Sequence, residues 1–140
     1  MKLSVIIIVI FFLVMIFGSY PKKISFQETK NIKYELRTFE CIKENSGELQ
    51  CPIKILNISA QNEIKKIEEI LSTLCCPFIP LSYEGQPEIK LLFQSISVNY
   101  MEIGVRGKEL SNGCFLPKKA RKFLNRIGNN DLIEVGYEKL

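Results

Sequence analysis

The first twenty residues of this 140-residue chain constrain its fold most, because they decide in which compartment the rest folds. A single basic residue, Lys2, precedes an unbroken apolar run from Val5 to Phe17, and the small residues Gly18 and Ser19 follow. This order of charge, apolar run and small residues is typical of a secretory signal peptide. We therefore predict that residues 1–19 are a signal peptide and that residues 20–140 form a single small domain.

An uncleaved membrane anchor is the alternative interpretation of the same segment. Thirteen consecutive apolar residues are fewer than the roughly 20 that span a bilayer. The longer segment from Leu3 to Tyr20 holds eighteen residues, and cleavage after Gly18 would place the bulky Ile16 where a small residue is preferred. We expect a secreted or extracytoplasmic protein, with a single-pass membrane-anchored protein as the alternative.

Export bears directly on the five cysteines, because disulfides form and persist in oxidising compartments. The candidates are Cys41, Cys51, Cys75, Cys76 and Cys114, and an odd number leaves at least one without a partner in the chain. We predict a Cys41–Cys51 bridge and a bridge from Cys114 to Cys75 or Cys76. The leftover cysteine suggests a disulfide-linked dimer, and a zinc site on Cys75, Cys76 and Cys114 is the remaining alternative.

Residues 32–58 predict a β-hairpin that brings Cys41 and Cys51 together. The second arm alternates apolar and polar residues, and Asn45–Gly47 supplies a three-residue loop. Centring the turn on Ser46 gives the pairs Lys43–Leu49, Cys41–Cys51 and Phe39–Ile53. A bulge near Thr38 is expected, because the apolar residues of the first arm change phase there.

An amphipathic helix is predicted after the hairpin. Apolar residues recur at three-four spacing across residues 59–74, and Ser59 is a suitable N-cap. Continuing this helix places Cys75 one turn after Leu71 on the apolar side, with Cys76 pointing away.

The remaining elements complete an α+β fold. Residues 88–95 and 98–106 alternate as a second antiparallel strand pair, although the first of these also fits a helical stripe. A short basic helix is predicted over residues 116–128 with Gly128 as its C-cap, and residues 133–137 suggest a final short strand.

The basic helix is the main surface feature of the predicted domain. It contains no acidic residue, and its basic residues are Lys118, Lys119, Arg121, Lys122 and Arg126. Such a helix can dock on an acidic protein, an anionic membrane surface or a polyanion through residues 117–127. The plainer interpretation is a surface helix whose apolar side packs on the core.

Asn57 is a glycosylation candidate, because Asn57, Ile58 and Ser59 form an N-x-S sequon. The motif has meaning in a eukaryotic secretory route, and Ser59 is also the expected cap of the following helix.

The chain contains no histidine, which excludes several kinds of site. Ser-His and Cys-His nucleophile pairs need an imidazole, and HExxH zinc sites need histidine ligands. Removal of Lys2 with the leader reduces the net charge of +4 to +3, too little to predict nucleic-acid binding. We predict no catalytic residue, resident metal or cofactor.

The expected function is that of a small exported, non-enzymatic binding protein with a protein partner. Inhibitors, ligands, effectors and envelope components belong to this class. The alternatives are a membrane-anchored accessory protein and a carboxylate-based hydrolase, whose chemistry needs two acids and no histidine.

Overall fold

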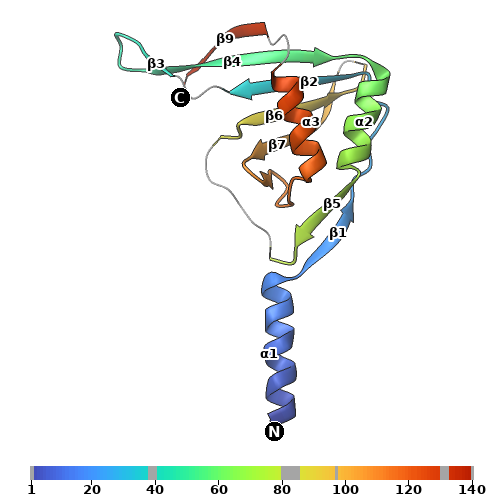
Figure 1. Cartoon of the computed structure of the whole chain (residues 1–140). Coiled ribbons are helices and arrows are strands. Elements are labelled where there is room, and N and C mark those ends of the chain that lie inside the picture. Colours follow the sequence, from blue (N-terminus) through green and yellow to red (C-terminus); the bar gives the residue numbers. More distant parts are fainter. Residues whose placement is uncertain (1, 38–40, 80–85, 97, 130–132, 140) are drawn as a thin grey trace.

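The computed structural model describes residues 2–37, 41–79, 86–96, 98–129 and 133–139, the last of these ranges by its backbone alone. It confirms the predicted α+β class, with helices and antiparallel strands cross-linked by two disulfides (Figure 1). In chain order the elements are α1 (Lys2–Phe17), β1 (Ser19–Lys23), β2 (Asn31–Arg37), β3 (Ile42–Lys43), β4 (Leu49–Ile58), α2 (Gln61–Leu71), β5 (Thr73–Pro77), β6 (Ile89–Gln94), β7 (Asn99–Arg106), β8 (Glu109–Leu110), α3 (Lys118–Gly128) and β9 (Ile133–Lys139).

Among the described residues, seven strands form one antiparallel sheet. They follow the order β3, β4, β2, β6, β7 and β8, and β9 pairs with β4. Strands β1 and β5 form a separate ribbon, which the sequence analysis did not predict. Phe115 bridges Cys75 of β5 and Glu109 of β8, so the ribbon continues the sheet past its β8 edge.

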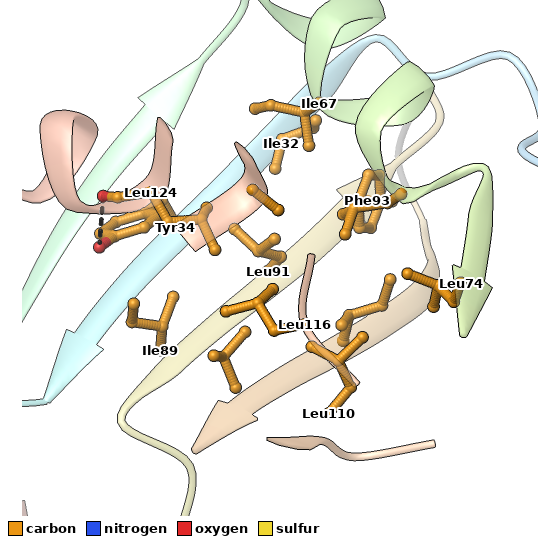
Figure 2. Close-up of a cluster of buried hydrophobic side chains, with 14 of the residues drawn as sticks. Ile32, Tyr34, Ile67, Leu74, Ile89, Leu91, Phe93, Leu110, Leu116 and Leu124 are labelled. Atoms are coloured by element: carbon orange, nitrogen blue, oxygen red, sulfur yellow. Dashed lines mark hydrogen bonds between the residues drawn. The ribbon is translucent and has the colours of Figure 1, made fainter. Parts of the chain in front are cut away.

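The hydrophobic core lies between one face of the sheet and the helices α2 and α3 (Figures 1 and 2). Strand residues that face the helices include Ile32, Phe93 and Ile58, which are direct neighbours on β2, β6 and β4. The buried helical residues that complete this core are Ile64, Ile67, Leu71, Ala120 and Leu124. Their three-four spacing is the reason that each helix presents one apolar side to the sheet.

The opposite face of the sheet, here called the outer face, points away from α2 and α3 (Figure 1). Because successive strand residues alternate between faces, its members on β2, β4, β6 and β7 include Lys33, Glu35, Ile53, Ile55, Asn57, Lys90, Leu92 and Glu102. Charged pairs cross part of it, with 3.2 Å between Lys33 and Glu35 and 3.7 Å between Lys90 and Glu102. Partly exposed ion pairs of this kind add little stability.

The tip of the predicted hairpin is confirmed. Lys43 pairs with Leu49, and the Glu44 backbone N–H donates to the Glu48 carbonyl at 2.9 Å. Gly47 in the loop has a φ of 84°, a left-handed conformation that glycine adopts without a steric cost.

The base of the hairpin corrects one predicted pair. Ile53 pairs with Arg37 and not with Phe39. The register changes between Arg37 and the tip, because the first arm holds more residues there than the second. Phe39 and the bulge predicted near Thr38 lie outside the described residues.

Helix α2 is shorter than predicted. It begins at Gln61 after Ala60 as the N-cap, without a side-chain cap, so the role predicted for Ser59 is wrong. It ends at Leu71, and Thr73–Pro77 form β5 instead of a further helical turn. The physical reason is β1, because its backbone groups pair with this segment from Thr73 to Pro77.

The later elements mostly follow the prediction. Strands β6 and β7 confirm the second antiparallel pair, so the helical alternative for the first of them is wrong. Helix α3 ends at Gly128 with Asn129 as its C-cap, one residue beyond the predicted cap. Strand β9 confirms the expected final strand.

Thr29 shows how the connection between β1 and β2 is held. It is a buried polar residue with 5% of its surface exposed. Its hydroxyl contacts the Glu68 carboxylate of α2 and lies 2.5 Å from the Tyr100 hydroxyl of β7. Burial raises the pKa of Tyr100, so this hydroxyl stays neutral and remains a hydrogen-bonding group.

Tyr34 is the largest fully buried side chain of β2, and its hydroxyl donates to the Leu124 carbonyl of α3 at 3.3 Å (Figure 2). Burial raises the pKa of Tyr34 to about 12, and the positive charge of Arg121 opposes this shift only in part. The neutral phenol therefore links the centre of the sheet to α3.

We expect the stability of the domain to fall with pH in the alkaline range. The unfolded chain releases the Tyr34 proton near pH 10 and the folded chain near pH 12. Stabilisation present below pH 10 is therefore lost between about pH 10 and 12, to a total of about 3 kcal/mol. Denaturant unfolding of Tyr34→Phe, in a Cys75→Ser background that prevents thiol exchange, should show a shallower fall, and equal slopes would contradict the role of Tyr34.

Candidate functional site

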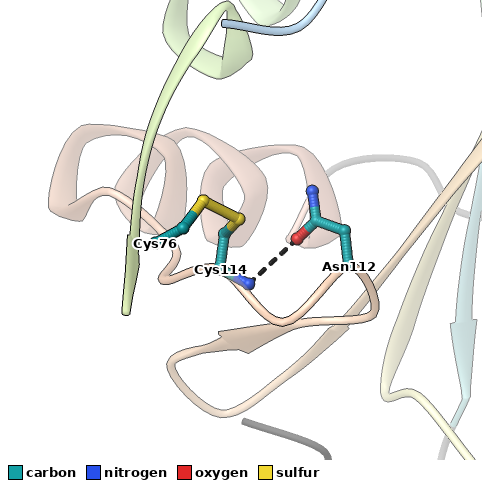
Figure 3. Close-up of a disulfide and its surroundings, with 3 residues drawn as sticks. All are labelled: Cys76, Asn112 and Cys114. Atoms are coloured by element: carbon teal, nitrogen blue, oxygen red, sulfur yellow. Dashed lines mark hydrogen bonds between the residues drawn. A yellow bond between two sulfur atoms is a disulfide. The ribbon is translucent and has the colours of Figure 1, made fainter. Parts of the chain in front are cut away.

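Helix α3 is held on the domain by its buried side and by a disulfide in the segment that precedes it. Its buried side, Ala120 and Leu124, packs on the core, whereas Phe123 and Ile127 are partly buried at the edges of that contact. The chain enters the helix from the Cys76–Cys114 disulfide, where the Cys114 N–H donates to the Asn112 side chain at 3.1 Å (Figure 3). The start of α3 is thus covalently tied to β5.

The structure divides the predicted basic residues into two groups. Arg121 points back to the domain, where its guanidinium donates to the Gly107 carbonyl at 2.8 Å and lies 3.8 Å from the Glu88 carboxylate. Lys118 is exposed at the first residue of the helix. Lys119, Lys122 and Arg126 share one side of α3 and line a common groove.

This groove, here called the α3 groove, has a volume of about 370 Å³ and lies between α3 and Ile70 of α2. Its lining residues are Ile70, Lys119, Lys122, Phe123 and Arg126. The Arg126 guanidinium lies 5.0 Å from the centre of the Phe123 ring, a cation–π contact that holds both side chains at the groove. None of its three cations forms an ion pair with another described residue.

The floor of the groove is well packed. Beneath it, a cavity of only about 10 Å³ separates α2 from α3. Its lining residues are Ile67, Ile70, Leu71, Ala120, Phe123 and Leu124. This volume holds no more than about one water molecule, so a ligand would lie in the α3 groove at the surface and not in the core beneath it.

Sequence reasoning found the cations of the groove but missed its apolar part. The three-four spacing places Phe123 on the core side of its helix and Ile70 beside the apolar stripe of the other helix. Both assignments are compatible with partial burial, yet only the approach of α2 to α3 brings these two residues together. The sequence does contain one indication of this apolar surface, because each of the two residues lies at the edge of the apolar stripe of its helix and not at the centre.

The structure confirms the Cys41–Cys51 bridge and resolves the second pair as Cys76–Cys114. Cys75 is exposed with a free thiol, contrary to its predicted place on an apolar helical side. In a β-strand neighbouring side chains point to opposite faces, which is why Cys76 is buried while Cys75 is not. The zinc alternative is wrong, because Cys76 and Cys114 are bonded to each other, and no metal-binding cluster occurs among the described residues.

Asn57 is exposed on β4, where it pairs through its backbone with Lys33 of β2. Its side chain is on the outer face. The α3 groove is on the opposite side of the sheet, where α2 and α3 pack.

Helix α1 exposes every residue along its length and has no buried side chain. It leads through Gly18 directly into β1, and the Phe78 N–H donates to the Gly18 carbonyl at 3.1 Å. A Cβ at Gly18 would lie 2.7 Å from the Phe78 ring, so this junction accepts glycine alone without rearrangement. Within the part of the chain that the structure describes, no helix has the length and apolar character to cross a membrane.

Comparison of this chain with known protein families, with curated proteins and with solved structures finds no match. Its function therefore has to be inferred from the chemistry of its own surfaces.

We expect the two disulfides to contribute unequally to stability. Cys76 and Cys114 are 38 residues apart, whereas Cys41 and Cys51 are 10 apart. A longer closed loop restricts the unfolded chain more, so loss of the first bridge should cost about 4 kcal/mol and loss of the second about 3 kcal/mol. Denaturant unfolding of the paired alanine variants measures both costs, and the reverse order would contradict this ranking.

Cys75 should be the single cysteine that reacts with iodoacetamide in the folded, unreduced protein, where it is exposed. The other four thiols are consumed in bridges, so they become reactive only after reduction. Peptide mass spectrometry reads the labelled positions, and labelling of Cys76 or Cys114 before reduction would contradict the assigned pairing.

Proposed function

We propose that this protein is a small exported, non-enzymatic binding protein that docks an acidic segment of a protein partner in the α3 groove. In this proposal residues 1–19 direct export, and removal of that leader releases residues 20–140. Two disulfides support folding in an oxidising compartment.

The observation that carries the proposal is the combination of charge and apolar surface in one groove. Lys119, Lys122 and Arg126 have no ion-pair partner among the described residues, and Ile70 and Phe123 supply an apolar surface beside them. Carboxylates of a partner would meet the cations through charge-assisted hydrogen bonds. An apolar side chain between those carboxylates would cover the groove floor.

The spacing of the cations further describes the ligand. Lys119 and Arg126 are separated by two helical turns, a span of roughly 10 Å along the axis. A partner segment that carries two carboxylates across a similar span, with a leucine or an aromatic residue between them, matches the groove.

An anionic membrane surface fits the groove less well. An interfacial helix inserts its apolar side into the lipid boundary. Helix α3 instead packs Ala120 and Leu124 on the core, so its apolar side is already covered by the domain. A concave groove also matches a peptide better than a flat layer of lipid headgroups.

Hydrolase chemistry receives no support from the same groove. A glycosidase-type site needs two carboxyl groups that flank the substrate, and the α3 groove is lined by cations and apolar residues. The exposed Glu28, whose pKa is lowered by a hydrogen bond from Lys30, is shifted in the direction opposite to that of a general acid.

Charge reversal tests the proposal. Lys119→Glu combined with Lys122→Glu should weaken binding by about tenfold, because each attraction of roughly 0.4 kcal/mol becomes a repulsion of similar size. The probe is a fluorescently labelled helical peptide with two glutamates flanking a leucine, and anisotropy gives its affinity. Binding to the wild type should also weaken as salt is raised.

The matched control is Lys22→Glu combined with Lys23→Glu on β1. It changes the net charge by the same amount away from the groove and should bind the peptide as the wild type does. Equal losses in both double variants would refute a specific site, as would equal binding of a peptide with glutamine in place of glutamate. Retention on phosphatidylglycerol vesicles without peptide binding would favour the membrane alternative and overturn the protein partner.

A further inference from the structure

We propose that Asn57 is the acceptor of an N-linked glycan that covers part of the outer face. This inference goes beyond the proposed binding function. Asn57 and Ser59 form the N-x-S sequon of the chain, and the structure gives independent reasons to assign it as a modification site.

The first reason is the position of the acceptor side chain. Asn57 is exposed near the end of β4, and its amide makes no hydrogen bond to a described residue. The next residue, Ile58, is 3% exposed and points into the core. Because strand residues alternate between faces, burial of Ile58 turns the Asn57 amide outward on the side of the sheet that has no helix.

The second reason is that the fold does not use Ser59. Its sequence position suggested a helix cap, but Ala60 is the N-cap of α2 and no side chain caps the helix. Ser59 is exposed, and its hydroxyl makes no hydrogen bond to a described residue. Helix capping therefore does not explain the serine at this position, and its hydroxyl is available to complete the sequon.

The third reason is the surface that a glycan would cover. Ile55 and Ile53 precede Asn57 on the same face of β4 at two-residue intervals, and both are partly exposed. A hydrophilic glycan at Asn57 would shield these apolar side chains, as exposed apolar patches on a sheet otherwise favour association.

The chemistry is a glycosyl transfer with a lipid-linked oligosaccharide as the co-reactant. The Asn57 amide nitrogen forms a bond to the anomeric carbon of the first sugar, and the bond from that carbon to the lipid pyrophosphate breaks. The nitrogen loses a proton, and the lipid pyrophosphate leaves with the electron pair. No oxidation or reduction takes place.

The glycan and the α3 groove would occupy opposite sides of the sheet. The helices that form the groove, α2 and α3, lie on one side of the sheet (Figure 1), whereas Asn57 belongs to the outer face. We therefore expect glycosylation to leave binding of the acidic peptide unchanged, so the two proposals fail or succeed separately.

The test is secretion of the full chain from a eukaryotic cell line that attaches N-glycans. The intact mass of the secreted wild type should exceed that of the polypeptide, and peptide-N-glycosidase F should remove the excess. Asn57→Gln and Ser59→Ala should each abolish the excess mass, and Ser59→Thr should retain it because threonine also completes the sequon. Asn125→Gln, at an exposed position outside any sequon, is the matched control and should stay glycosylated.

Secreted wild type at the bare polypeptide mass would overturn the proposal. Retention of the glycan in Asn57→Gln would overturn it as well. A folding defect in one variant cannot mimic the expected pattern, because Ser59→Thr and Asn125→Gln must be secreted with the glycan while the wild type reports occupancy directly.

Discussion

The Cys76–Cys114 disulfide is the constraint on which the rest of the structure depends. It joins β5 to the segment that leads into α3, next to the backbone hydrogen bond from the Phe115 N–H to the Cys75 carbonyl at 2.9 Å. The bridge therefore attaches the β1–β5 ribbon to the edge of the sheet and sets the start of α3. The loop that this bridge closes is longer than the loop closed by Cys41–Cys51, so this bridge restricts the unfolded chain more.

Placement of α3 next to α2 has a consequence for the surface. The two helices bury their central apolar residues against the sheet, and the flanking Ile70 and Phe123 remain partly exposed where the helices meet. Arg121 is held by Gly107 and Glu88, which leaves the cations on the other side of α3 to line the groove. The candidate site thus lies where the two helices pack together, and its positive charge comes from the basic residues of α3.

Much of the fold could be predicted from local patterns. Alternation identified the hairpin and the β6–β7 pair, and three-four spacing identified both helices of the domain. The errors around Cys75 share one cause. Strand β1 is not recognisable at the leader boundary, so the predicted helix runs on to Leu74, and Cys75 is expected on its apolar side. At the candidate site the cations were found, but the apolar floor was not.

The sequence by itself determined which residues have an apolar side, that the hairpin cysteines face each other, and that histidine-based chemistry is absent. Only the tertiary structure decided that Cys76 and not Cys75 bridges to Cys114, and which basic residues gather at one groove. The physical reason is the range of the interactions. Side-chain periodicity depends on residues that are close together in the sequence, whereas strand pairing and helix contact depend on segments far apart in the chain.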